Sequence, residues 1–198
     1  VWTTFSDGTS TSTSATVTGL TNGTSYTFRV AAVNSAGTGS YSTASTAVTP
    51  ITTPGAPTSV SAATGSSRAT ISWTAPASNG GSSITGYAVQ FSTDNGSTFA
   101  TQVLTGSTST SYTYTGLTPS TAYVFRIAAI TAVGQGSWSS NTSSVTIQDL
   151  PGAPTSVTGT DGNAQVVVSW TAPTSNGGAA ISDYAIQYSS NSGSTWTT

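Results

Sequence analysis

Few side chains in this sequence could carry out acid–base, nucleophilic or metal chemistry. The 198 residues include three basic and five acidic residues and no His or Cys. All three basic residues are arginines, and all five acidic residues are aspartates. General acid–base catalysis needs a group that titrates near the working pH, and covalent catalysis needs a nucleophile activated by a base or a metal. Only Asp, Ser, Thr and Tyr remain for such roles, so we expect no catalytic residue and no enzyme activity.

The aspartates do not form a pattern that would hold a metal ion or a shared proton. Asp94 and Asp161 lie in turn sequences, where Asp is favoured because it bonds to its own backbone. Asp7, Asp149 and Asp183 are isolated along the chain. Calcium prefers several converging carboxylates. We therefore expect no metal ion and no cofactor.

The chain repeats itself at a fixed interval of 97 residues. PGAPTSV begins at Pro54 and again at Pro151, and SWTAP begins at Ser72 and again at Ser169. Self-similarity at domain length indicates one folded unit copied end to end. We predict the C-terminal part of a unit over residues 1–53, a complete unit over 54–150, and the N-terminal part of another over 151–198.

The composition excludes several classes of protein. Only 4% of the residues are charged and the net charge is −2, so no basic stripe is present to neutralise phosphates, and we expect no nucleic-acid partner. No apolar run approaches the ~20 residues of a membrane span. Aromatic residues make up 9% of the chain, which argues against disorder.

The complete unit has the alternation of β-strands and no helical period. In the segment 68–74, Ala69, Ile71 and Trp73 share one face. Asp94-Asn95-Gly96 is typical of a hairpin turn. The pattern predicts an all-β, seven-stranded antiparallel β-sandwich. Its strands are a first edge strand after the Pro-rich entry at 54–60, and then 68–74, 84–91, 98–104, 110–114, 121–131 and 137–147.

Together these residues resemble a fibronectin type III domain, and the resemblance covers essentially the whole chain. The shared features are the Pro-rich entry, a Trp in the second strand, a Tyr in the third, and a Leu-x-Pro-x-x-x-Tyr corner. The resemblance implies that the Trp packs between two sheets and that the corner Tyr hydroxyl bonds to the upstream backbone. Asn22 replaces the corner proline in the first copy. The fold-defining residues are Trp73, Trp170, Tyr87, Tyr184, Leu20, Tyr26, Leu117 and Tyr123.

Three sequons for N-linked glycosylation occur, at Asn22, Asn95 and Asn141. Each lies in a turn or a late strand, where a glycan has room. A chain this rich in Asn, Ser and Thr also produces sequons by chance, and Asn95 already has a role in a turn. Glycosylation and chance both remain open.

Two sets of recurring residues have a functional and a structural interpretation. Arg29 and Arg126 occupy equivalent positions on an outer sheet face, either as a binding spot or as stems that cover apolar surface while their charged ends stay in water. We favour the second interpretation. Aromatic residues also recur and suit either a sugar-binding platform or packing, of which packing is favoured; they are Trp2, Phe99 and Trp196, and Tyr41 and Trp138.

The surface and the two partial units predict self-association with copies of the same chain. Sheet edges are normally guarded by charges, and a net charge of −2 gives little repulsion. Each partial unit alone would leave an apolar face in water. Either the sequence is an excerpt of a longer array, which we favour, or the partial unit of one chain is completed by the next.

These expectations combine into one functional hypothesis. Fold-defining residues recur and reactive ones do not, so the copied feature is a shape. We predict a non-catalytic repeat array of bacterial or phage type that forms an extracellular fibre, spacer or surface assembly on a cell or virion. The alternative is an adhesin or a carbohydrate-associated binding module of a larger secreted protein, with a glycan or cell-surface partner.

Overall fold

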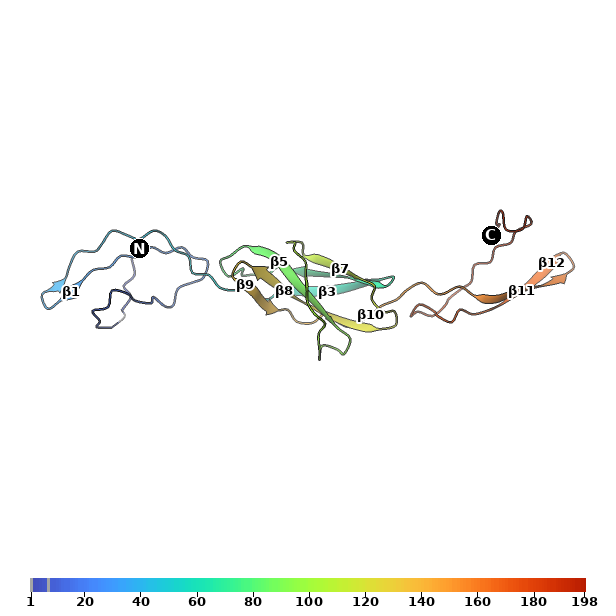
Figure 1. The fold of residues 1–198 in the computed structure, drawn as a ribbon, viewed down its shortest axis with the longest axis horizontal. Helices are drawn as coiled ribbons and strands as arrows, with labels where there is room; N and C mark the ends of the chain where they lie inside the picture. The colour runs from blue at the N-terminus through green and yellow to red at the C-terminus, as the bar shows by residue number, and fades with distance from the viewer. Residues whose placement is uncertain (1, 7) are drawn as a thin grey trace.

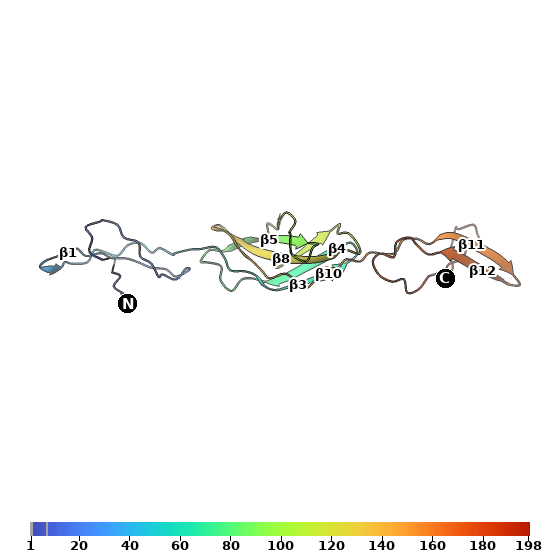
Figure 2. The same ribbon diagram turned by 90° about the horizontal axis from the view of Figure 1, so that it is seen from below.

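One complete β-sandwich lies between two thinner end segments in an elongated chain (Figures 1 and 2). The structure is a computed structural model that describes residues 2–6 and 8–198. Every regular element in those residues is a strand. The expectation of an all-β fold is confirmed.

The sandwich consists of two antiparallel sheets. In the first sheet β4 lies between β3 and β7. The second sheet has the order β10-β8-β5-β6, and β9 also pairs with β8. The first sheet contains β3 (Thr58–Gly65), β4 (Arg68–Thr74) and β7 (Ser111–Thr115). The second contains β5 (Ile84–Ser92), β6 (Val103–Leu104), β8 (Ala122–Thr131), β9 (Gly134–Trp138) and β10 (Val145–Thr146).

Alternating apolar side chains on the facing strands form the core. Ile71 of β4 and both Phe125 and Ile127 of β8 are fully buried. Trp73 packs edge-on against Tyr87 of the opposite sheet, with ring centroids 5.0 Å apart. Burying a side chain of this size contributes about 1.5–3 kcal/mol relative to leaving it in water. The period-two pattern therefore places the core where the sequence predicts it.

Two strands differ from their predicted bounds. The strand expected over 98–104 is only Val103–Leu104, because residues 94–98 close a tight turn. The strand expected over 137–147 begins earlier and is interrupted between β9 and β10. There, Ser139 Oγ accepts a bond from Ile127 N at 3.0 Å and Thr142 Oγ1 accepts one from Phe125 N at 3.1 Å. Side-chain hydroxyls thus replace backbone carbonyls and break the regular ladder.

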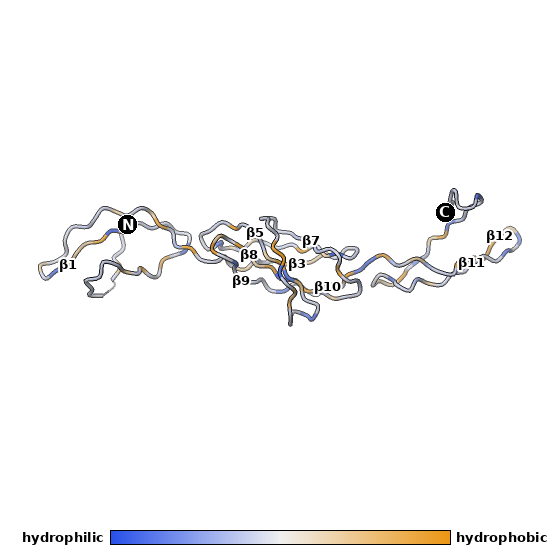
Figure 3. Tube along the Cα trace, viewed as in Figure 1, coloured by the Kyte–Doolittle hydropathy of each residue, from blue (hydrophilic) through white to orange (hydrophobic). Residues whose placement is uncertain are grey.

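The end segments keep local strand pairing but have no opposing sheet. Residues before the sandwich contain the hairpin of β1 (Val33–Asn34) and β2 (Gly37–Thr38). Residues after it contain β11 (Thr155–Gly162) and β12 (Gln165–Thr171). Hydrophobic stretches occur in both end segments as well as in the sandwich (Figure 3). Their apolar side chains consequently stand in solvent.

Candidate functional site

The corner tyrosines hold the backbone in both copies. Tyr123 Oη accepts a hydrogen bond from Thr118 N at 3.1 Å, and Tyr26 Oη accepts one from Thr21 N at 3.0 Å. The Thr21 backbone bond also lowers the pKa of Tyr26, because it stabilises the phenolate. The corner therefore closes in the first copy although Asn22 stands in place of proline.

The remaining fold-defining residues lie at equivalent places in both kinds of unit. Leu117 is buried in the sandwich, whereas its equivalent Leu20 is half-buried. Trp170 and Tyr184 stand 5.1 Å apart, tilted by 59°, close to the geometry of the same pair in the sandwich. The Trp–Tyr contact therefore forms within a single end segment, although residues 181–187 are not assigned to a strand there.

The sequon asparagines are exposed. Asn22, Asn95 and Asn141 all lie at the surface. Asn95 has a φ of 58° inside its turn. In the third sequon the middle residue, Thr142, is buried with its hydroxyl in the sheet, whereas the sequon hydroxyl residue, Ser143, is exposed. Glycosylation at these positions stays a prediction.

Asp94 organises a turn. Its carboxylate accepts hydrogen bonds from Ser92 Oγ and Thr98 Oγ1, each at 2.6 Å, and from Thr98 N at 2.9 Å. These bonds, the one from Ser92 first, hold the pKa of Asp94 well below its usual range. Asn191 stands at the equivalent position of the next unit and accepts the same backbone bond from Thr195 at 2.9 Å. The position needs a hydrogen-bond acceptor and not a charge.

Asp149 joins the end of the sandwich to one of its turns. Its carboxylate accepts hydrogen bonds from the hydroxyls of Ser66 and Ser67, the latter at 2.6 Å. Both bonds lower the pKa of Asp149, that of Ser66 more. Asp161 and Asp183 are exposed, and Asp7 lies outside the described residues. Within the described part of the chain, no group of three His, Cys, Asp or Glu residues could hold a metal ion.

The same hydrogen bonds recur where each unit meets the next. At the first junction, Thr52 N donates to Gly80 O at 2.8 Å and Gly55 N donates to Ser78 O at 2.9 Å. At the second junction, 97 residues on, Asp149 N donates to Gly177 O at 2.6 Å and Gly152 N donates to Ser175 O at 2.9 Å. In both, the linker runs along the turn that follows the second strand of the next unit.

Glycines make this close approach of linker and turn geometrically feasible. A Cβ added to Gly80 would lie 2.2 Å from Thr52 O, and one added to Gly177 would lie 2.1 Å from Asp149 O. A Cβ added to Gly136, in the middle of β9, would likewise lie 2.2 Å from Pro54 O. By residue type alone, Gly80 and Gly177 indicate only a turn. Their recurrence at identical positions in two copies was the signal that could have identified the junction.

A stacked arginine lies on the outer face of the five-stranded sheet. The Arg126 guanidinium carbon lies 3.6 Å from the ring centroid of Phe99 and 4.7 Å from that of Trp138. Arg126 Nε and Nη2 both donate to Gln90 Oε1, at 2.9 and 2.7 Å. Burial lowers the pKa of Arg126, although the group stays charged at any ordinary pH. Four chain segments therefore meet at one cation.

The first unit carries the same arrangement. The Arg29 guanidinium carbon lies 4.2 Å from the ring centroid of Trp2 and 4.3 Å from that of Tyr41. Arginine and aromatic residues thus form one cluster in each of these two units. The stem interpretation of the arginines is incomplete, because the Arg126 head also stacks on two rings and bonds to Gln90.

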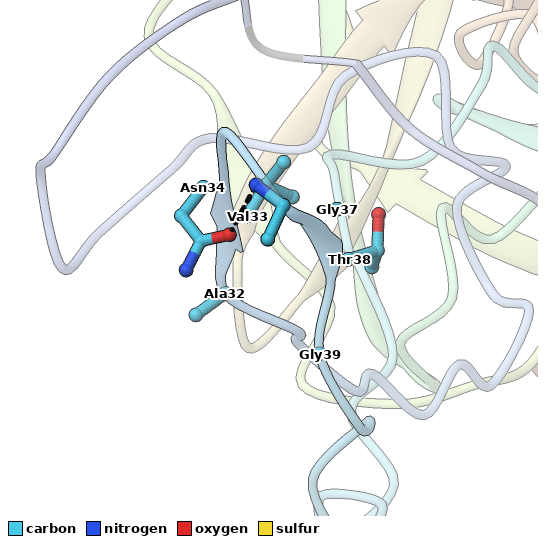
Figure 4. A pocket seen from close by; sticks show the side chains of 7 residues that line it. Ala32, Val33, Asn34, Gly37, Thr38 and Gly39 are labelled. Atoms are coloured by element: carbon cyan, nitrogen blue, oxygen red, sulfur yellow. Dashed lines mark hydrogen bonds between the residues drawn. The ribbon is translucent and has the colours of Figure 1, made fainter.

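A shallow hollow lies in the first end segment and is lined by residues 32–34 and 36–39 (Figure 4). It measures about 350 Å³, and Asn34 Oδ1 closes its turn by accepting a bond from Ala36 N at 2.9 Å. Gly39 on its wall is equivalent to Gly136, which contacts Pro54 of the preceding linker. No helix of the described residues is long and apolar enough to cross a membrane.

Comparison with known proteins gives consistent relatives. The family profile described as "Fibronectin type III domain" matches residues 3–48 and 55–145. Chitinase A1 of Niallia circulans is 43% identical over 145 residues, covering 68% of this chain and 19% of that protein. Exoglucanase B of Cellulomonas fimi is 36% identical over 196 residues, covering 90% of this chain and 17% of that protein.

Similar sequences also occur in animal proteins. Human neogenin is 33% identical over 186 residues, covering 88% of this chain and 12% of that protein. Among solved structures, the FN1–FN3 domains of chicken CNTN1 are 26% identical with a TM-score of 0.47, covering 75% of this chain and 54% of that one. The chain spans less than a fifth of each of these three curated relatives.

Proposed function

This chain belongs to the fibronectin type III family, and we propose that it serves as a non-catalytic spacer in an extracellular or cell-surface protein. Its units are held in a fixed relative orientation. Each unit adds roughly 30–40 Å along the array, the length of a ten-residue strand at about 3.4 Å per residue. Relatives that contain such domains include two bacterial enzymes whose names denote polysaccharide substrates and an animal protein.

The repeated junction is the observation that carries this proposal. The two linkers differ in sequence, Thr52-Thr53 in one and Asp149-Leu150 in the other, yet their backbones make the same two hydrogen bonds. A flexible tether would not need glycines at positions where an added Cβ would lie less than 2.5 Å from a linker carbonyl oxygen. A linker locked on both sides transmits orientation from one unit to the next, which is what a spacer requires.

Amide hydrogen exchange of the full chain tests the locked junction. We expect the Thr52 and Asp149 amides to be protected, because each donates to the next unit. Gly80→Ala should abolish protection at Thr52 and leave Asp149 unaffected, and Gly177→Ala should do the reverse. Gly106→Ala is the matched control, since Gly106 has a similar φ of +59° with nothing within 4 Å of the added Cβ. Unprotected Thr52 and Asp149 amides in the unmodified chain would refute the proposal.

A second candidate function is a carbohydrate-associated module of a secreted enzyme. The similarity to Chitinase A1 and Exoglucanase B favours it, and Trp138 supplies an aromatic ring at the surface of β9. This function predicts binding of neutral chitin or cellulose oligosaccharides that Trp138→Ala removes. A glycan array probed with the unmodified chain and with Trp138→Ala distinguishes this function from that of a spacer, which binds none of these oligosaccharides.

A further inference from the structure

Arg126 carries a positive charge that no acidic side chain neutralises. Burial is the sole cause that shifts its pKa, with no contribution from a neighbouring carboxylate. A guanidinium has five N–H donors in a fixed fork. Gln90 Oε1 accepts from Nε and from Nη2, so three N–H groups have no partner among the described residues.

The two rings hold these free donors in place. Phe99 and Trp138 lie on the guanidinium at 3.6 and 4.7 Å, and Gln90 fixes its remaining edge. An arginine that is already ordered loses little further entropy when it forms new bonds. The rings cover part of the guanidinium, so an ion pair there is somewhat stronger than at a fully open surface.

The shape and charge of the free edge match a carboxylate. A planar carboxylate pairs with a guanidinium through two parallel N–H···O bonds. Trp138 beside it is only partly buried and adds an aromatic group for contact with a sugar ring. We infer that Arg126, Phe99 and Trp138 form a binding site for the carboxylate of an acidic polysaccharide, a polymer of uronic acids.

The repeat favours a polymer over a second copy of this chain. Arg29, between Trp2 and Tyr41, repeats the stacking on two rings one unit earlier, and a polymer with many carboxylates gains avidity by binding both arginines. The carboxylates of Asp94 and Asp149 are occupied by hydroxyl donors. The exposed Asp161 and Asp183 do not recur between units, so copies of the chain could not serve every site.

Affinity electrophoresis of the full chain tests the inference with one polymer in two forms. We expect polygalacturonate in the gel to retard the chain, and the same polymer with its carboxyls methyl-esterified to leave its mobility unchanged. Retardation should weaken as salt is raised, because the pair is partly screened. Equal retardation by both forms, or by neither, would overturn the inference.

Arginine variants of equal charge locate the site. Arg126→Gln should weaken polygalacturonate binding at least about tenfold, as expected for lost charge-assisted hydrogen bonds, and Arg29→Gln added to it should abolish binding. Arg68→Gln is the matched control, because Arg68 lies on β4, outside both stacks, and should change affinity less than about twofold. Arg126→Lys keeps the charge without the fork and should bind as weakly as Arg126→Gln.

Two results would assign the arginine differently. An Arg68→Gln loss as large as that of Arg126→Gln would show that net charge alone attracts the polymer. Sedimentation that shows Arg126-dependent dimers without polymer would assign the stack to contacts between chains. The thermal unfolding of each variant shows whether it still folds, so that loss of the site can be told apart from loss of the fold. The comparison of free and esterified polymer uses the unmodified chain and does not depend on any variant.

Discussion

The complete unit and the end segments contain the same strands in different surroundings. Ile127 of β8 is 0% exposed, whereas its equivalent Val30 is 74% exposed. Both nevertheless make the same bonds: the backbone oxygen of each accepts from a serine 12 residues on, at 2.8 and 2.9 Å. The serine hydroxyls accept from Ile127 N and Val30 N as well. Local pairing is thus written into each strand, while burial depends on the second sheet.

This contrast separates two contributions to the fold. Turns, corners and edge hydroxyls form without a core, since the Tyr26 corner closes as the Tyr123 corner does. The free energy that makes folding cooperative comes from apolar surface removed from water. The end segments have the first contribution and lack most of the second.

The largest expected effect comes from joining the two partial units. Residues 151–194 followed directly by residues 1–53 supply each position of the 97-residue unit once. We expect this chain to unfold in one cooperative thermal transition, whereas each segment alone should show none, because only together do they bury both faces. Differential scanning calorimetry measures this. A broad, non-cooperative melt of the joined chain would show that the equivalence of the units is only superficial.

Removing the second-strand tryptophan should lower the free energy of unfolding by several kcal/mol in the sandwich and not in the end segment. Trp73 is 5% exposed in the core, so Trp73→Ala should lower the free energy of unfolding of the sandwich by about 3–5 kcal/mol. Trp170→Ala, in an end segment, should leave that transition unchanged. Urea titration followed by tyrosine fluorescence compares the two variants. Similar losses would mean that the end segment contributes to the same cooperative core.

The smallest effect concerns Asp149, which belongs to both regions. Its carboxylate bonds to the sandwich and its N–H to the next unit. Because its pKa is lowered in the folded state, its stabilising effect is present above the unfolded pKa near 3.9 and is lost as pH falls through the lower folded value. The melting temperature of Asp149→Asn should therefore be lower than that of the unmodified chain at pH 7, and the gap should close in acid.

A charge-matched variant controls for net charge. Asp161→Asn removes a carboxylate that makes no side-chain hydrogen bond in the described residues, so its melting temperature should follow that of the unmodified chain at every pH. A gap for Asp149→Asn that is constant from pH 7 to pH 2 would exclude the carboxylate as its cause.

The sequence predicted the sandwich well because its signals are local. Period-two alternation placed Ile71 and Trp73 in the core, and the turn residues around Asp94 marked a hairpin. The strand that the sequence extended from 137 to 147 was misjudged, since Ser139 and Thr142 look like ordinary strand residues. Only their partners on β8 show that their hydroxyls have taken the place of carbonyls.

The candidate site was harder to predict because its parts are distant in sequence. Gln90, Phe99, Arg126 and Trp138 lie on three strands and a loop, and no periodic pattern joins them. The 97-residue repeat gave a partial signal, since both an arginine and flanking aromatics recur. Their meeting depends on strand register: Gln90 is the direct cross-strand neighbour of Arg126. Register is a tertiary property that a single sequence leaves unspecified.

The interrupted last strand has a consequence for a protein with so few charges. An edge strand normally needs lysines to discourage another chain from adding to its ladder. Here Ser139 and Thr142 interrupt the ladder itself, so an incoming strand finds no continuous row of donors and acceptors. Such a guard depends on geometry alone. At this edge it should act equally well in brine and in fresh water, at acid or at neutral pH, where a guard made of charges would weaken.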